Sequence, residues 1–245
     1  MQALTPRQLT SLHKAEQIRL ASEGAAAIDQ LWPMLDLDDR KRMSTYLSAV
    51  YGVAVDYRAR SVEAAGLYLS AFGALHGEVV TPTAVATSPL VADRMRKAFR
   101  VLGPVSLRQS LLVMEREPAE VLTRRKIASA AVKAILDGGR DEVISTARKS
   151  PAITGWRRVV SPDACDFCVM HAARGAVFSA ETATFSAHNN CSCAAEPAMR
   201  GGEGQRIEVD PYVAVGAKRK SNAGAWLRSN QKVIEQMRAD ESIYA

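Results

Sequence analysis

The residues best suited to chemistry are four cysteines that lie close together in the chain. Cys165 and Cys168 form a Cys-x-x-Cys pair, Cys191 and Cys193 form a Cys-x-Cys pair, and these are the only cysteines among 245 residues. The N-terminal sequence lacks the layout of a secretory signal, so such clustering favours a metal site over disulfides. His188 lies three residues before the second pair and is a fifth candidate ligand.

The spacing of these side chains fits a zinc tetrahedron. A Cys-x-x-Cys turn places two thiolates on one side of a tight loop, which matches two corners of the site. Zinc takes four ligands, so His188, Cys191 and Cys193 compete for the two remaining places, and the sequence does not decide between them. The competing interpretation is buried free cysteines, or a disulfide formed on oxidation. We therefore predict a zinc ion held by Cys165, Cys168 and two of the other three.

The zinc is expected to be structural rather than catalytic. Four available thiolates are typical of closed structural sites, and no His-Glu-x-x-His motif is present. The zinc deaminase signature needs a glutamate where this chain has Phe167 and Asn190. Glu181 and Glu196 are the nearest acids, and both are expected at the surface. His171 is expected to be an exposed histidine that binds no metal.

Apolar residues at helical spacing predict a helical body over the first two thirds of the chain. One helix is expected over residues 12–31, ended by Pro33, because proline cannot donate a helical hydrogen bond. The next is expected to start at Asp36 or Asp38 as N-cap and to extend past Phe72. These stripes of apolar residues predict helices that pack on one another.

Further helices are expected after a loop at residues 81–89. Ser106 is expected to cap one of them, and a longer helix is expected over residues 118–137. The pair Gly138-Gly139 predicts a stop, because glycine readily takes the left-handed conformation found at helix ends. Residues 141–149 are then expected to form a short separate helix.

The character of the chain changes after Pro151. Residues 156–160 and the Val177-Phe178 pair are β-prone, and residues 209–215 are expected to be extended. Asn222 to about Arg238 is expected to form a helix with Trp226, Val233 and Met237 on one side. The predicted fold class is mainly α, with a helical domain at 1–150, a small zinc-knuckle α+β domain at 151–200, and a linker with a C-terminal helix at 201–245.

Composition excludes some classes of protein. Apolar residues make up 47% of the chain, too many for a disordered protein, and no apolar run approaches the length of a membrane span. The net charge is +6, and residues 101–160 carry 11 Lys and Arg against 6 Asp and Glu. The densest points of this basic strip are Arg124, Arg125, Lys126, Arg157 and Arg158. It is interpreted either as a solvated helix face or as a surface for DNA phosphates or an acidic partner.

The cysteine region resembles the C-terminal domain of MuF-type head-morphogenesis proteins, which are minor capsid proteins of tailed bacteriophages, including actinobacteriophages. The resemblance covers about residues 150–200 and is carried by Trp156, the run from Ser161 to Cys168, Gly175, the run from His188 to Cys193, and Pro197. The family often has proline where this chain has Asn189 and arginine where it has Ser192. Neither difference removes a candidate ligand.

The resemblance implies a virion or prohead component that is assembled in the bacterial host cytoplasm. Its implied partners are the phage portal and major capsid proteins, together with packaged DNA through the basic strip, and no membrane. We expect a non-enzymatic role. The alternatives are a capsid maturation protease, for which Ser161 and His171 are the available pair, and a zinc-knuckle nuclease with His188 as base.

Overall fold

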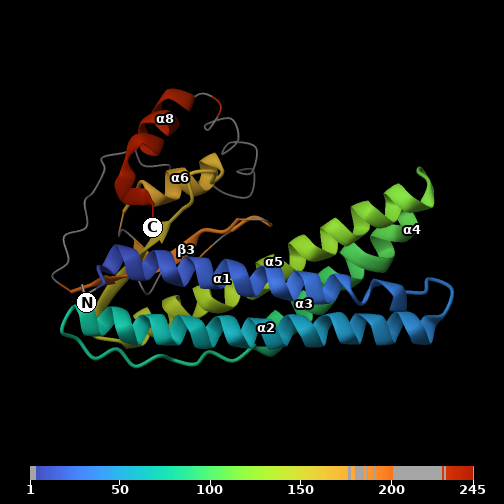
Figure 1. Ribbon diagram of the computed structural model, residues 1–245, viewed down its shortest axis with the longest axis horizontal. Helices are drawn as coiled ribbons and strands as arrows, with labels where there is room; N and C mark the ends of the chain where they lie inside the picture. The colour runs from blue at the N-terminus through green and yellow to red at the C-terminus, as the bar shows by residue number, and fades with distance from the viewer. Residues whose placement is uncertain are drawn as a thin grey trace.

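Long helices build the first 149 residues, and a small sheet follows them. The structure, a computed structural model, describes residues 4–175, 178–179, 185, 187–189, 191–200, 228 and 230–244. Figure 1 shows three long helices side by side along the molecule, with the sheet, α6 and α8 gathered toward one end. These three helices are α1 (Pro6–Asp29), α2 (Arg40–Leu75) and α5 (Arg116–Lys149). The predicted mainly α class is confirmed.

Side-chain caps set the starts of the first two long helices. Thr5 and Gln8 form a reciprocal capping box at α1, with Pro6 in the first turn. The cap of α2 is Asp39, whose carboxylate accepts from two backbone amides. The prediction of Asp36 or Asp38 is therefore wrong. Asp36 instead accepts from the backbone amides of Asp38 and Asp39 and shapes the turn before the helix.

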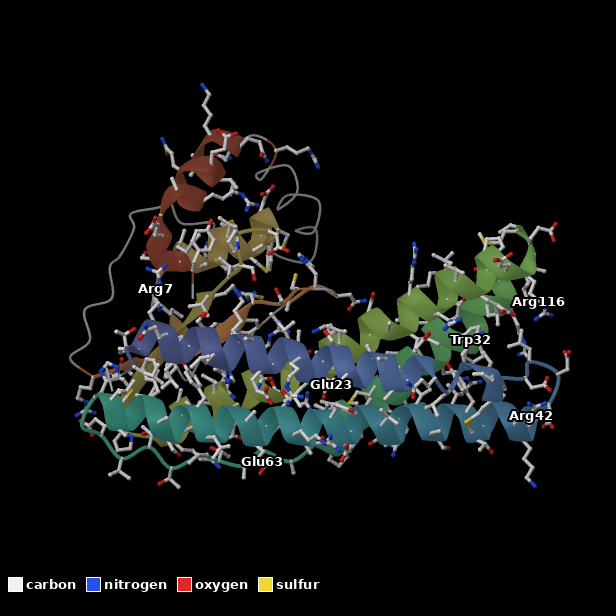
Figure 2. The ribbon with its side chains drawn as sticks, viewed as in Figure 1. Arg7, Glu23, Trp32, Arg42, Glu63 and Arg116 are labelled. Atoms are coloured by element: carbon white, nitrogen blue, oxygen red, sulfur yellow. The ribbon has the colours of Figure 1, made fainter. Side chains whose placement is uncertain are left out.

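The predicted apolar stripe of α2 is buried from Val50 to Phe72 except at Tyr57, which is half-buried, as are Met43 and Leu47 near the helix start. Val50 and Ala54 lie in a cluster with residues of α1, α3 and α5, and Leu69 and Phe72 lie in a second cluster nearer the sheet. Arg7, at the start of α1, donates to the backbone oxygen of Glu241 near the C-terminus of the chain (Figure 2). The two ends of the described chain thus lie against each other.

The helix α5 passes through Gly138 and Gly139 without a break, so the predicted stop and the separate short helix are wrong. An added Cβ at Gly138 would lie 2.7 Å from the backbone oxygen of Arg58 on α2. At Gly139 it would lie 2.5 Å from the Gln17 side chain on α1. The glycines therefore serve close helix packing rather than a helix end.

Shorter helices and a loop complete the body. They are α3 (Pro89–Arg100), a π-helical turn (Val101–Val105) and α4 (Ser106–Ser110). Ser106 is not an N-cap as predicted; its hydroxyl accepts from the ammonium of Lys126 at 2.8 Å. The predicted loop before α3 is confirmed. The buried carboxylate of Glu142 holds this loop to α5 by accepting from the backbone amides of Ala84 and Val85.

An antiparallel sheet in the order β2-β1-β3 follows α5. Its strands are β1 (Ile153–Val159), β2 (Phe178–Ser179) and β3 (Ala194–Met199). The strand predicted around Trp156 is confirmed as part of β1, and Phe178 lies in β2 while residue 177 is outside the described part. The sequence did not predict β3. Its Ala, Glu and Pro content has low β propensity, and pairing with β1 at the sheet edge overrides it.

The sheet and the helical body share one apolar core. Trp156 of β1 is fully buried in the same cluster as Tyr68 and Phe72 of α2 and Val143 of α5. Whether the chain divides into separate domains near residue 150 stays a prediction.

Two short helices, α6 (Asp166–Ala172) and α8 (Gln231–Ala239), pack together beyond the sheet (Figure 1). A 3₁₀ turn (Glu241–Ile243) follows α8. The described part of the predicted C-terminal helix is thus α8, in which Met237 is buried and Val233 is half-buried. Trp226 and the extended segment expected at residues 209–215 lie outside the described residues. In the part of the chain that is described, no helix has the length and apolarity needed to cross a membrane.

Candidate metal centre

The five candidate ligands surround one hollow of about 250 Å³. Cys165 is the N-cap residue of α6, and Cys168 lies one turn later in that helix. Cys191 and Cys193 come directly before β3, and His188 precedes them. The Cys-x-x-Cys pair is therefore a helix start rather than the predicted loop, yet it still places both sulfurs on one side because they are three residues apart.

Three sulfurs form the centre of this cluster. The Sγ atoms of Cys165, Cys168 and Cys191 all lie within 4.8 Å of one another, and those of Cys165 and Cys191 are 3.9 Å apart. Around a tetrahedral zinc ion with bonds of about 2.3 Å, ligand sulfurs lie about 3.8 Å apart. The donor atoms and their separations thus fit zinc. Small movements of the side chains would bring the three sulfurs to the separations found around a zinc ion.

The two remaining candidates lie next to different sulfurs of the trio. The Nδ1 atom of His188 is 3.9 Å from the Cys165 sulfur, and the His188 side chain is exposed beside the ring of Phe167. The Cys193 sulfur is 3.5 Å from the Cys168 sulfur and is buried. Both can reach the trio, so the geometry brings all five predicted residues together.

Sequence reasoning missed two buried arginines in this centre. Arg158 of β1 donates to the Cys193 sulfur at 3.0 Å and to the Cys168 sulfur at 3.5 Å. Arg140 of α5 donates to the backbone oxygens of Cys191 and Cys193 at 2.6 and 2.7 Å. The two guanidinium groups therefore tie the cysteine segment to the sheet and to the main helix. The sequence did hold a signal for the burial of Arg158. Side chains alternate along a strand, so Arg158 lies on the same face of β1 as the buried Trp156.

The surroundings favour negative charge on two of the sulfurs. A hydrogen bond from Cys168 is the main cause that lowers the pKa of Cys193, and the positive charges of Arg140 and Arg158 act in the same direction. Hydrogen bonds from the side chain and backbone amide of Cys168, and from His188, also lower the pKa of Cys165. Thiolates are the form of cysteine that binds metal, so this environment suits a metal centre.

Other predicted residues lie differently from what the sequence suggested. Glu196 was expected at the surface but is buried in β3, where it forms an ion pair with Arg157. His171 was expected to be exposed but is half-buried on α6, with its ring against Phe167. Burial lowers the pKa of His171 to about 4. Glu181 lies outside the described residues.

The basic strip does not form one surface. Arg158 is buried against the cysteines, and Arg157 forms an ion pair with Glu196. On α5, Arg124 forms an ion pair with Asp29 of α1, and the Lys126 ammonium donates to Ser106. The residues named for the basic strip therefore do not all share one surface, because strand and helix residues that are close in sequence separate in the fold.

Comparison with known proteins gives one family. The family described as VG15 protein matches residues 4–215, which is most of the chain and includes both the helical body and the cysteine cluster. No curated protein and no solved structure matches the chain.

Proposed function

Because this chain belongs to the VG15 protein family and is a phage-type protein, we propose that it is a structural minor capsid protein of a tailed phage. In this proposal it is a MuF-type head-morphogenesis protein that associates with the portal and major capsid proteins. It acts in the prohead and virion, which are assembled in the bacterial host cytoplasm. A structural zinc ion stabilises its C-terminal part.

The observation that carries the proposal is the thiolate-rich cluster between α6 and β3. Cys165, Cys168 and Cys191 hold the zinc, and the fourth ligand is His188 or Cys193. Bound zinc supplies a cross-link between the start of α6 and the segment before β3. Sulfur-rich sites of this kind contribute folding free energy and leave no open position for a substrate.

The surroundings of the cluster support a structural role. Arg140 and Arg158 hold the backbone and sulfur atoms of the cysteine segment from two directions, so the metal cross-link connects to the main core. The strands β1 and β3 are already buried against the helical body, so the link mainly holds α6 and the cysteine segment to that core.

The alternative proposal is an enzyme that acts during head assembly. A capsid maturation protease needs a serine activated by a histidine, for which Ser161 and His171 are the candidates. The Ser161 hydroxyl lies 3.3 Å from that of Ser192, and His171, with a pKa of about 4, is a weak base at neutral pH. A zinc-knuckle nuclease would use His188 as base. The contact of Ser161 with Ser192 and the low pKa of His171 both favour the structural role over a protease.

Co-expression with the portal and major capsid proteins of the same phage tests the proposal. We expect the wild-type chain to co-sediment with proheads and to leave both partners and DNA uncut. The Cys165→Ser/Cys168→Ser variant should bind less, because the cross-link is lost. Capsid trimming or DNA cleavage that appears only with this chain, and that stops in a Ser161→Ala or His188→Ala variant, would establish an enzyme instead.

A further inference from the structure

Helix α3 carries a positively charged face outside the metal centre. Its cations are Arg94, Arg96, Lys97 and Arg100. Residues 94–114 contain five Lys and Arg in total, with Arg108 as the fifth, and no Asp or Glu. The charge count over residues 101–160 did not reveal this run, because the run begins at residue 94, before the counted region.

All four α3 cations are exposed, as is Leu90 in the first turn, whereas two large apolar residues of the helix face inward. Met95 and Phe99 are buried in the core with α2 and α5. Lys97 and Arg100 lie in the last turn, where cations stabilise the helix dipole. Stabilisation of the dipole accounts for the positions of Lys97 and Arg100. It does not account for Arg94 and Arg96, which lie before the last turn.

Two of the described acids near this face are already paired with other cations. Asp137 forms ion pairs with Lys133 and Arg140, and Asp141 pairs with Arg58. These acids and Arg94 line the same hollow of about 610 Å³ between α3 and α5. Asp93 is the one acid on α3 itself.

None of the four α3 cations forms an ion pair with the described residues. The Arg96 guanidinium lies over the ring of Tyr51, 4.1 Å from its centroid. The face therefore keeps its positive charge and presents it to solvent.

We propose that the exposed face of α3 binds the phosphate backbone of double-stranded DNA without reading its sequence. Arg94, Lys97 and Arg100 repeat every third residue, so they rise about 4.5 Å per step along one side of the helix. Arginine presents a planar fork that pairs with two phosphate oxygens, and three of the four cations are arginines. Such contacts neutralise phosphates and release counterions, which is the main driving force of non-specific DNA binding.

The chemistry of the face fits DNA better than an acidic protein. Protein interfaces have an apolar or aromatic centre that is depleted of charge, whereas the outer side of residues 94–100 presents only charged groups. Single-stranded nucleic acid is bound by exposed aromatic rings, and the one ring here, Tyr51, is half-buried beneath Arg96. The inference goes beyond the proposed function, because it concerns neither the zinc nor the capsid partners.

Fluorescence anisotropy with a short labelled duplex of arbitrary sequence tests the inference. The test variant is Arg94→Gln/Lys97→Gln/Arg100→Gln. The matched control is Arg19→Gln/Arg60→Gln/Arg116→Gln, which removes the same charge from exposed ion pairs on α1, α2 and α5. Both variants are first checked for wild-type helicity.

We expect the wild type to bind at low salt and to weaken as potassium chloride rises. The α3 variant should bind at least ~10-fold more weakly and should reduce the slope of log affinity against log salt by about 3, since three phosphate contacts are lost. The control should stay close to wild type.

Four results would overturn the inference. They are no binding of the duplex at low salt, equal weakening in both variants, competition by polyglutamate as effective as by duplex of equal charge, and tighter binding of single-stranded DNA. The third result would assign the face to an acidic protein partner.

Discussion

The guanidinium of Arg158 lies 3.0 Å from the sulfur of Cys193, and both side chains are buried. This contact joins the C-terminal end of β1 to the residue directly before β3. A buried positive charge needs a compensating partner, and the cysteine cluster supplies negative charge at this position. The sheet and the proposed zinc centre therefore depend on each other.

Replacement of Arg158 by methionine should weaken zinc binding about 10- to 100-fold, the usual effect of losing a partner that orients a metal ligand. Competition with a chromophoric chelator measures this affinity. Arg158→Lys should restore part of it, and Arg125→Met, at an exposed position on α5, should have no effect. Unchanged zinc affinity in Arg158→Met would show that the arginine serves only the packing of β1.

The ligand set can be ranked by single substitutions. Cys165→Ser, Cys168→Ser and Cys191→Ser should each abolish zinc retention, because these three sulfurs form the centre of the cluster. We expect Cys193→Ser to do the same and His188→Ala to be mild, since Cys193 is buried beside Cys168 whereas His188 is exposed. Elemental analysis after gel filtration gives the zinc content. Loss of zinc in His188→Ala with retention in Cys193→Ser would reverse this ranking.

Two helical glycines should respond to alanine in opposite directions. Gly138→Ala should destabilise the protein by about 1–3 kcal/mol, because the new methyl group meets the backbone of α2. Gly52→Ala on α2, where nothing lies within 4 Å of the added group, should stabilise it by about 0.5–1 kcal/mol. Urea denaturation followed by circular dichroism measures both. A stabilising Gly138→Ala would mean that α5 and α2 are farther apart than described.

Acid should destabilise the helical body through His13. This side chain of α1 stacks on Tyr68, and burial lowers its pKa from 6.5 to about 4. The unfolded chain then takes up a proton between pH 6.5 and 4 while the folded chain does not. Stability is therefore full above pH 6.5 and falls by up to about 3 kcal/mol as the pH drops to 4.

The His13→Phe variant should keep the stacking contact and lose this part of the pH dependence. Denaturation curves of wild type and variant at pH 7, 5.5 and 4.5 make the comparison. Parallel loss of stability in both proteins would contradict the assignment to His13.

Local patterns in the sequence were sufficient where one element determines its own structure. The α2 stripe, the strand around Trp156 and the clustering of the cysteines follow from periodicity and spacing. The Gly138-Gly139 pair misled because its role is contact between helices, which no local pattern reveals. Strand β3 was missed for the same reason, since its pairing with β1 comes from the fold rather than from its own composition.

The positions of charged groups were the least predictable part. Arg157 and Arg158 are adjacent in the sequence, yet one pairs with Glu196 and the other reaches the cysteines. Alternation along β1 separates them, and only the register of the sheet determines which partner each meets. The basic face on α3 emerges only once Asp137 and Asp141 are known to be paired with other cations.

Zinc content measured together with structure tests the proposed centre most directly. Protein purified without chelator should contain about one zinc per chain, as a single four-ligand site requires. Removal of the metal should expose residues 155–200 to limited proteolysis, while circular dichroism retains the helical signal of α1, α2 and α5. A chain that is fully folded and protease-resistant without metal, and that takes up no zinc when zinc is supplied, would contradict the account.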